Sequence, residues 1–155
     1  MMQLADFLDC DAIKASLSGG NKRSLLQQLA NLAAQRLGLE PAAVLASLTE
    51  REQLGSTGFG NGVAIPHGKI EGLERIYGLF ARLSEPVDYK AIDGRQVDLV
   101  FLLLSPGNAG AEHLKALAAI SRVTRDAATL ERLRGARSRD ALAALLMGAE
   151  ERDAA

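Results

Sequence analysis

The chain has only two histidines, His67 and His113, and their imidazoles are its most evident chemical groups. A neutral imidazole carries a free lone pair near pH 7 and attacks phosphorus. His67 follows Pro66, which restricts its own backbone and that of the preceding residue, so the segment that presents the ring is stiff. Gly68 leaves room beside the ring for a partner, and Lys69 brings a positive charge. These surroundings favour phosphoryl transfer through His67.

Candidate phosphate-binding groups directly precede His67, in a glycine-dense stretch between residues 55 and 62. Successive backbone N–H groups in such a stretch form a concave nest for an anion, and two hydroxyls add further donors. The candidates are Gly55, Ser56, Thr57 and Gly58. The stretch lacks the Gly-Lys-Ser/Thr ending of a P-loop, and its glycines precede a strand rather than a helix. It therefore matches neither a nucleotide-binding nor a dinucleotide-binding fingerprint.

Arg51 and His113 are the candidates for stabilising a phosphoryl group from the side. Arg51 falls at the end of a predicted helix, and its planar guanidinium offers paired donors to phosphate oxygens. His113 falls in the first turn of another predicted helix, where the helix end attracts anions and disfavours a protonated ring. Each also has a structural interpretation, Arg51 as a solvated helix-end charge and His113 as a capping or packing residue. The order of Arg51, the glycine-dense stretch, His67 and His113 favours the chemical interpretation.

Bulk composition narrows the classes of function. The chain has 155 residues, with 18 Lys and Arg against 19 Asp and Glu and a formal net charge of -1. DNA binding usually leaves a basic footprint, so nucleic acid is not expected as the main partner. The single cysteine, Cys10, excludes an internal disulfide. A basic segment followed by a long apolar run would predict a leader or a membrane insertion. The sequence shows no such segment, so we expect a cytoplasmic protein.

The elements that must position these residues follow from the hydrophobic periodicity. Leucines at helical spacing predict a helix between Asn21, as its N-cap, and Gly38, as its stop. Pro41 opens a second helix that runs to about residue 51 or 52. Strands are predicted near 12–15 and at 63–65, 76–83 and 97–104, and helices at 111–125, 128–133 and 139–147. The stretch 55–62 is expected to be an irregular loop.

Helices come first, strands lie in the middle and helices return, which predicts an α/β fold with a sheet sandwiched between helices. Residues 1–155 are expected to form one domain, with a tail frayed from about residue 150. The helical leucines, Leu114 among them, are assigned to the core. Phe59 has few local apolar neighbours and is interpreted as a docking contact.

The long run from Leu48 to Lys69 resembles the signature of the IIA domains of the bacterial phosphoenolpyruvate-dependent phosphotransferase system (PTS), in their fructose and mannitol type, EIIA type 2. The block Glu112–Ala118 is similar to the later histidine segment of that family, and the stretch Val87–Leu104 also fits. The resemblance covers essentially the whole chain. It implies a mixed sheet of roughly five strands flanked by α-helices.

The resemblance also implies a role for each matching residue. His67 matches the family's phosphorylated histidine, which accepts phosphate on Nε2. His113 matches the second active-site histidine, and Arg51 matches an arginine that helps to bind the phosphoryl group. The implied donor is an HPr-like (NPr) phosphocarrier protein, and no cofactor, metal or nucleotide is implied for this step. Because donor and acceptor are both histidines, catalysis reduces to alignment and charge stabilisation.

The sequences Leu-Gly-Ser-Thr-Gly and His-Leu-Lys-Ala-Leu-Ala, in a free-standing chain, are more like the family's nitrogen-regulatory branch than its transport components. That branch implies a signalling role, read by targets such as potassium-transporter components or sensor kinases. Two alternatives stay open: a sugar-specific IIA component that passes phosphate to a IIB domain, and a non-catalytic binding regulator. A metal-dependent hydrolase built on His67 and His113 is poorly supported, because two histidines without nearby acidic ligands are few for zinc.

Overall fold

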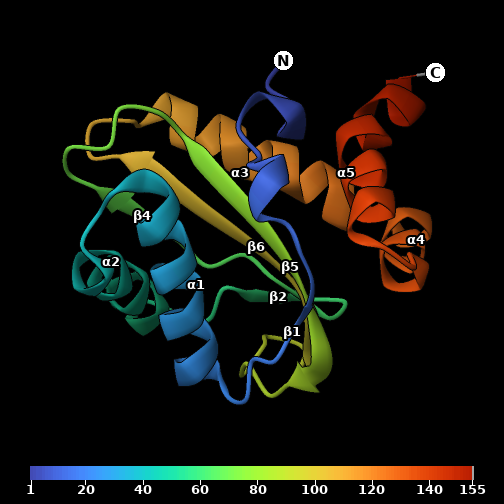
Figure 1. The fold of residues 1–155 in the computed structure, drawn as a ribbon, viewed down its shortest axis with the longest axis horizontal. Coiled ribbons are helices and arrows are strands. Elements are labelled where there is room, and N and C mark those ends of the chain that lie inside the picture. Colours follow the sequence, from blue (N-terminus) through green and yellow to red (C-terminus); the bar gives the residue numbers. More distant parts are fainter. Residues whose placement is uncertain (155) are drawn as a thin grey trace.

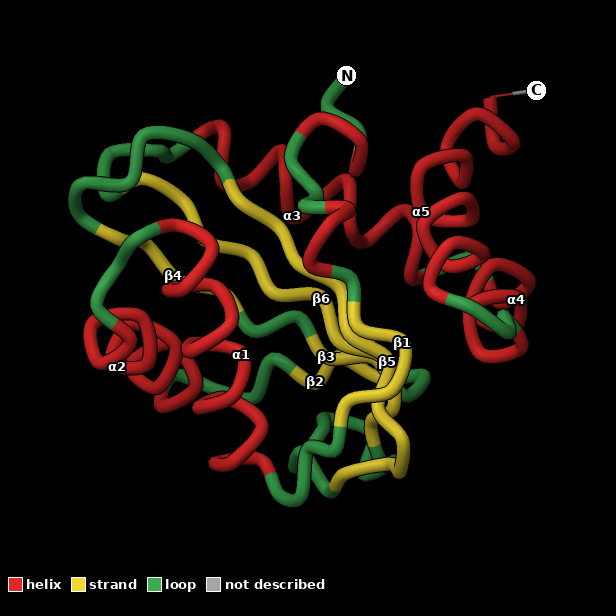
Figure 2. The backbone as a smooth tube through the Cα atoms, viewed as in Figure 1, coloured by secondary structure: helices red, strands yellow, loops and turns green. Residues whose placement is uncertain are grey.

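The computed structural model describes the backbone of residues 1–154 and the side chains of residues 1–148. Six strands form one mixed sheet in the order β1-β5-β6-β3-β2, with β4 also pairing with β6 (Figure 2). The strands are β1 (Lys14–Leu17), β2 (Gly58–Gly60), β3 (Val63–Ala64), β4 (His67–Ile70), β5 (Tyr77–Val87) and β6 (Val97–Pro106). The α/β fold class is confirmed, with one strand more than the five that the resemblance implied.

The short strands β3 and β4 lie one after the other along the same edge of β6. Both run parallel to it, β3 beside Leu99 and Val100 and β4 beside the last residues of β6, from Leu103 to Pro106. Ile65 and Pro66 separate the two pieces, because the proline has no N–H with which to continue the ladder. The other edge of β6 pairs antiparallel with β5, so β6 is a central strand with a partner on each edge.

Two helices cover one face of the sheet and three cover the other (Figure 1). They are α1 (Lys22–Leu37) and α2 (Pro41–Gln53) on the first face, and α3 (Ala111–Thr124), α4 (Ala127–Gly135) and α5 (Arg139–Ala154) on the second. Two 3-10 turns, η1 (Leu4–Asp6) and η2 (Cys10–Ala12), precede β1. Successive side chains of β6 alternate between the two cores: Leu102 packs toward α1 and α2, whereas Leu103 packs toward α3 and α5.

The predicted helix boundaries of the first layer are confirmed. The Asn21 side chain accepts a hydrogen bond from the amide of Ser24 and caps α1, which ends at Gly38 with a φ of 68°. Pro41 occupies the first position of α2. At the other end of the chain, α5 continues to Ala154 rather than stopping near residue 147. The fraying expected from about residue 150 stays a prediction, and Ala155 lies outside the described residues.

Three strand predictions need correction. The first strand is β1, about two residues later than the predicted 12–15, because η2 occupies part of that segment. The stretch 55–62 is not wholly irregular, since β2 pairs antiparallel with β3. Gly58 also lets β2 lie close to the segment between β5 and β6, because a Cβ there would lie 2.8 Å from the Cβ of Ala91. The sequence pattern also missed β4, whose four residues are too few to show a period.

Candidate functional site

His67 is the first residue of β4 and lies opposite Leu103 of β6, so a strand rather than a turn presents the ring. Only 6% of its surface is exposed. Its Nδ1 lies 2.7 Å from the backbone oxygen of Ile65. A carbonyl oxygen only accepts, so Nδ1 carries the proton and donates it. The lone pair of the neutral ring is therefore on Nε2.

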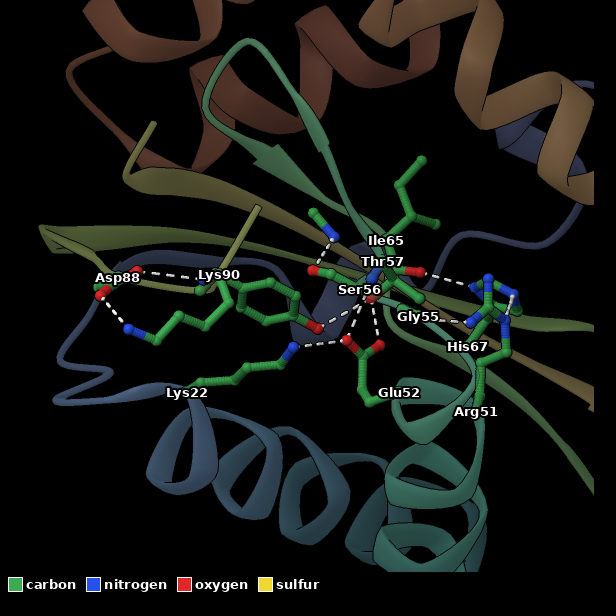
Figure 3. Close-up of polar contacts among 12 residues, drawn as sticks. Lys22, Arg51, Glu52, Gly55, Ser56, Thr57, Ile65, His67, Asp88 and Lys90 are labelled. Carbon is green, nitrogen blue, oxygen red and sulfur yellow. Dashed lines mark hydrogen bonds and ion pairs between the residues drawn. The ribbon is translucent and has the colours of Figure 1, made fainter. Parts of the chain in front are cut away.

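Arg51 reaches this nitrogen from the last turn of α2. Its Nε donates to His67 Nε2 over 3.1 Å, and its Nη1 donates to the backbone oxygen of Gly55 over 2.9 Å (Figure 3). The contact with Nε2 independently identifies that nitrogen as the acceptor. α2 approaches β4 closely because Gly68 has no side chain, and a Cβ there would overlap Ser47 Oγ. Ser47 Oγ instead donates to the backbone oxygen of Lys69 over 2.9 Å.

His113 completes the polar group from the other layer of helices. It lies in the first turn of α3, and its ring centroid is 5.5 Å from that of His67, with the ring planes tilted by 50°. Its Nδ1 is 2.6 Å from the hydroxyl of Ser105, near the end of β6. The structure therefore brings together Arg51, His67 and His113, which lie on three different elements.

Both histidines are held neutral at pH 7. Burial is the main reason that the pKa of His67 lies below its ordinary value of 6.5; the hydrogen bond to Ile65 acts in the opposite direction, and the charge of Arg51 adds to the lowering. Burial, followed by the electrostatic interactions with His67 and Lys69, lowers the pKa of His113 to about 4. A neutral His67 retains its lone pair, and a neutral His113 has one N–H and one lone pair.

Several donors of the glycine-dense stretch have partners inside the protein. The amide of Gly55 donates to the backbone oxygen of Glu52, and the amide of Thr57 donates to the Glu52 carboxylate. The amide of Gly58 donates to the hydroxyl of Ser56 over 3.1 Å. Thr57 is fully buried, and its hydroxyl also bonds to Glu52. The amides of Gly55, Thr57 and Gly58 and the Thr57 hydroxyl are therefore in use inside the protein, and the phosphate-binding role of Gly55, Ser56, Thr57 and Gly58 stays a prediction.

Arg51, His67 and His113 line an open cleft of about 600 Å³. Its other lining residues are Ser47, Glu50, Gln53, Leu54, Gly68, Lys69, Leu114 and Leu117. Two of the leucines are strongly exposed, Leu54 by 84% and Leu114 by 67%, so the assignment of Leu114 to the core is wrong. Phe59 is 49% exposed and lines a neighbouring hollow with Ile65 and Ala118. The rim of the cleft therefore carries exposed apolar side chains beside the charged Glu50 and Lys69.

Sequence reasoning missed Ser105 and Leu54. Ser105 interrupts the apolar run of β6 directly before Pro106, a visible signal, but nothing local indicates that its partner is His113. Leu54 follows α2, where a leucine by itself predicts burial. Among the side chains that the structure describes, those of residues 1–148, no three His, Cys, Asp or Glu gather closely enough to hold a metal ion. In the same part of the chain, no helix combines the length and apolar character needed to cross a bilayer.

The fold and this pair of histidines define a known class of protein. Residues 6–148 match the family described as "Phosphoenolpyruvate-dependent sugar phosphotransferase system, EIIA 2". The chain belongs to this family and is thus a component of the phosphotransferase system.

Similar proteins show which branch of this family the chain resembles. A nitrogen regulatory protein of Bradyrhizobium diazoefficiens is 48% identical over 145 residues, which cover 94% of this chain and 95% of the relative. One from Escherichia coli K12 is 36% identical over 150 residues, or 96% and 92% of the two chains. The crystal structure of the nitrogen regulatory protein IIA-Ntr of Neisseria meningitidis superposes with a TM-score of 0.86 at 36% identity, covering 92% of this chain and 98% of that chain. The predicted resemblance to the nitrogen-regulatory branch is confirmed.

Proposed function

We propose that the chain accepts a phosphoryl group on His67 Nε2 from an HPr-like (NPr) phosphocarrier protein and carries it as a signal. The observation that supports this most directly is the pair of contacts on the His67 ring. Nδ1 is occupied by the Ile65 carbonyl, and Nε2, with its lone pair, contacts Arg51 on the wall of an open cleft. A nucleophilic nitrogen beside an arginine is suited to receiving a phosphoryl group, because the guanidinium can donate two hydrogen bonds to phosphate oxygens.

The transfer balances without a metal or an added base. The lone pair of His67 Nε2 forms a bond to phosphorus as the nitrogen–phosphorus bond of the donor phosphohistidine breaks. The bonding pair returns to the donor nitrogen, and because the other nitrogen of the donor ring carries a proton, a neutral donor imidazole is left. The positive charge passes to the phosphorylated His67 ring, whose Nδ1 proton stays in its hydrogen bond to Ile65. In-line alignment and charge stabilisation are then the main requirements.

Two neighbours supply that stabilisation. Arg51 moves its donors from Nε2 to the phosphoryl oxygens once the lone pair is used, and it is already within 3.1 Å. His113, neutral and adjacent to His67, offers an N–H to the same oxygens. Burial of both rings strengthens these contacts, because water competes less for the donors.

The exposed apolar side chains of the rim form the proposed docking surface for the carrier. Leu54, Phe59 and Leu114 are exposed on different elements around or beside the cleft, and exposed apolar patches rimmed by polar residues mark protein–protein sites. Lys69 is exposed at the cleft, where a cation attracts the phosphorylated donor. Because only 6% of His67 is exposed, the donor histidine has to enter the cleft rather than meet a protruding ring.

The output is proposed to be regulatory and cytoplasmic. The relatives named nitrogen regulatory protein support this branch. Phosphorylation adds nearly two negative charges at the centre of the apolar docking surface, which changes its affinity for a target such as a potassium-transporter component or a sensor kinase. Passing phosphate to a sugar-specific IIB domain is the alternative output from the same site. A fructose-like EIIA relative, whose match covers less of this chain, supports this alternative.

Incubation with phosphoenolpyruvate and the upstream carrier proteins tests the transfer. We expect the wild type to acquire an acid-labile phosphate, His67→Ala to acquire none, and His113→Ala to be labelled more slowly. Labelling of His67→Ala at the wild-type level would exclude this residue as the acceptor. A non-catalytic regulator is distinguished by target binding: equal affinity of wild type, His67→Ala and His67→Asp would favour it over a phosphorylation switch.

A further inference from the structure

Ser105 is a fully buried polar residue in contact with the site, and the family resemblance assigned it no role. It lies near the end of β6, between Leu104 and Pro106, with none of its surface exposed. Its Oγ lies 2.6 Å from Nδ1 of His113. Within the part of the chain that the structure describes, this nitrogen is the single hydrogen-bond partner of the hydroxyl.

The direction of this hydrogen bond follows from what each atom can do. The hydroxyl has one proton, and a buried donor left without an acceptor is costly. If His113 Nδ1 donated to Ser105, the hydroxyl proton would have no acceptor within reach. If Ser105 donates to Nδ1, the proton is used and the nitrogen lone pair is used as well. The second arrangement satisfies both groups, and it requires the imidazole proton to be on Nε2.

We propose that Ser105 is a positioning residue that fixes His113 in the Nε2–H tautomer, opposite to the tautomer of His67. The two rings have different partners at the same ring position. At His67 a carbonyl, which can only accept, keeps the proton on Nδ1, whereas at His113 a hydroxyl with no other acceptor keeps it on Nε2. One ring therefore has a lone pair on Nε2 and the other has a proton there. That complementarity is what a nucleophile and its supporting donor need.

The catalytic consequence rests on the proposed function. When His67 carries the phosphoryl group, a His113 Nε2–H donates to a phosphoryl oxygen, whereas a lone pair on that nitrogen would repel it. The tautomer matters because the ring is neutral: the pKa of His113 is lowered to about 4, so a second proton is absent at pH 7. A cationic ring would donate from both nitrogens and would need no serine.

Nitrogen-15 NMR of the histidine side chains, on the unphosphorylated full chain at pH 7, tests the tautomer directly. We expect His113 protonated on Nε2 and His67 protonated on Nδ1 in the wild type. Ser105→Ala should give a mixture at His113, with the ratio of the two tautomers shifted about tenfold, while His67 is unchanged. Ser105→Thr retains the hydroxyl and should retain the wild-type signals. A wild-type His113 protonated on Nδ1, or an unchanged ratio in Ser105→Ala, overturns the proposal.

The initial rate of phosphate transfer from the carrier gives the second readout. It should fall about tenfold in Ser105→Ala and recover in Ser105→Thr, with unfolding by urea confirming that both variants are folded. A tautomer shift in Ser105→Ala without any loss of rate overturns the positioning role. Absence of labelling in the wild type would instead refute the proposed function, and the NMR measurement would still decide the tautomer assignment.

Discussion

Arg51 and Glu52 are neighbours at the end of α2, yet they serve two unlike regions (Figure 3). Arg51 points into the cleft toward His67, where its partners are a ring nitrogen and one carbonyl. Glu52 points the other way, into a closed polar network with Lys22, Thr57 and Tyr89. We call this second group the Glu52 network.

The Glu52 network leaves little bonding capacity unused. The Thr57 hydroxyl donates to the Glu52 carboxylate and therefore accepts from Tyr89, 2.9 Å away. The other carboxylate oxygen accepts from the Thr57 amide and from Lys22 Nζ, at 3.1 and 2.9 Å. Burial raises the pKa of Tyr89, which keeps its hydroxyl proton available.

The cleft differs because its groups end on an open surface. Arg51, His67 and His113 each have a first partner inside the protein and a second side that faces the cleft. The contrast teaches that satisfied buried networks hold the loop and helix in place, whereas partly free polar groups next to a surface do chemistry. Substitutions in the two regions should therefore separate activity from stability.

Arg51→Ala should have the largest effect, and on activity. Loss of the guanidinium should lower the initial rate of His67 labelling about 100-fold, because preset charged donors stabilise the transferring group. The labelling rate of Arg51→Lys should lie between those of wild type and Arg51→Ala, since lysine keeps the charge but loses the paired donors of the guanidinium. Labelling time courses measure the rates, and urea unfolding should show little change. A wild-type rate in Arg51→Ala would remove Arg51 from the proposed site.

Thr57→Val should lower stability and leave activity nearly unchanged, the opposite of Arg51→Ala. The shape is retained, but Glu52 and Tyr89 each lose a buried hydrogen-bond partner, so the free energy of unfolding should fall by about 1–3 kcal/mol. The labelling rate of the folded protein should stay close to wild type. Thr49→Val, at an exposed position of α2, is the control for the same change of residue type and should change stability by less than about 0.5 kcal/mol. Equal stability of the two variants would contradict the network's structural role.

Acidification should weaken the fold through the cleft histidines. The pKa of His113 is about 4 in the folded protein against an ordinary 6.5, so the unfolded state binds more protons between these values. The stabilisation from this group is fully present above about pH 6.5 and is lost as the pH falls toward 4. His67, whose pKa is also lowered, acts in the same direction. Urea unfolding at several pH values should show a shallower loss in His113→Gln than in wild type.

Lys22→Met should have the smallest effect. Lys22 pairs with Glu52 and lies 4.4 Å above the ring of Tyr89, but its side chain is partly exposed, and such ion pairs contribute little. We expect a loss of about 0.5–1 kcal/mol, decreasing as salt is added. A loss as large as that of Thr57→Val would show that the ion pair, rather than the hydroxyl, holds the Glu52 network together.

Local patterns predicted much of the framework and of the site. Leucine periodicity, the Asn21 cap, the Gly38 stop and Pro41 placed the first two helices, because helix ends depend on nearby residues. The glycine-dense stretch was harder, since β2 forms only through pairing with β3 and a close approach to the segment around Ala91. The same dependence on distant contacts hid β4, which exists because β6 lies beside it.

By itself the sequence determined which groups were available: two imidazoles, a guanidinium at a helix end, and the family signature around His67. Only the tertiary structure decided which nitrogen of each ring is free, that the loop amides bond inward to Glu52 and Ser56, and that Ser105 contacts His113. The physical reason is that a hydrogen bond is directional and short, so a ring's partner depends on positions fixed by the whole fold. Residue type states what a group can donate or accept, and packing alone selects the atom that meets it.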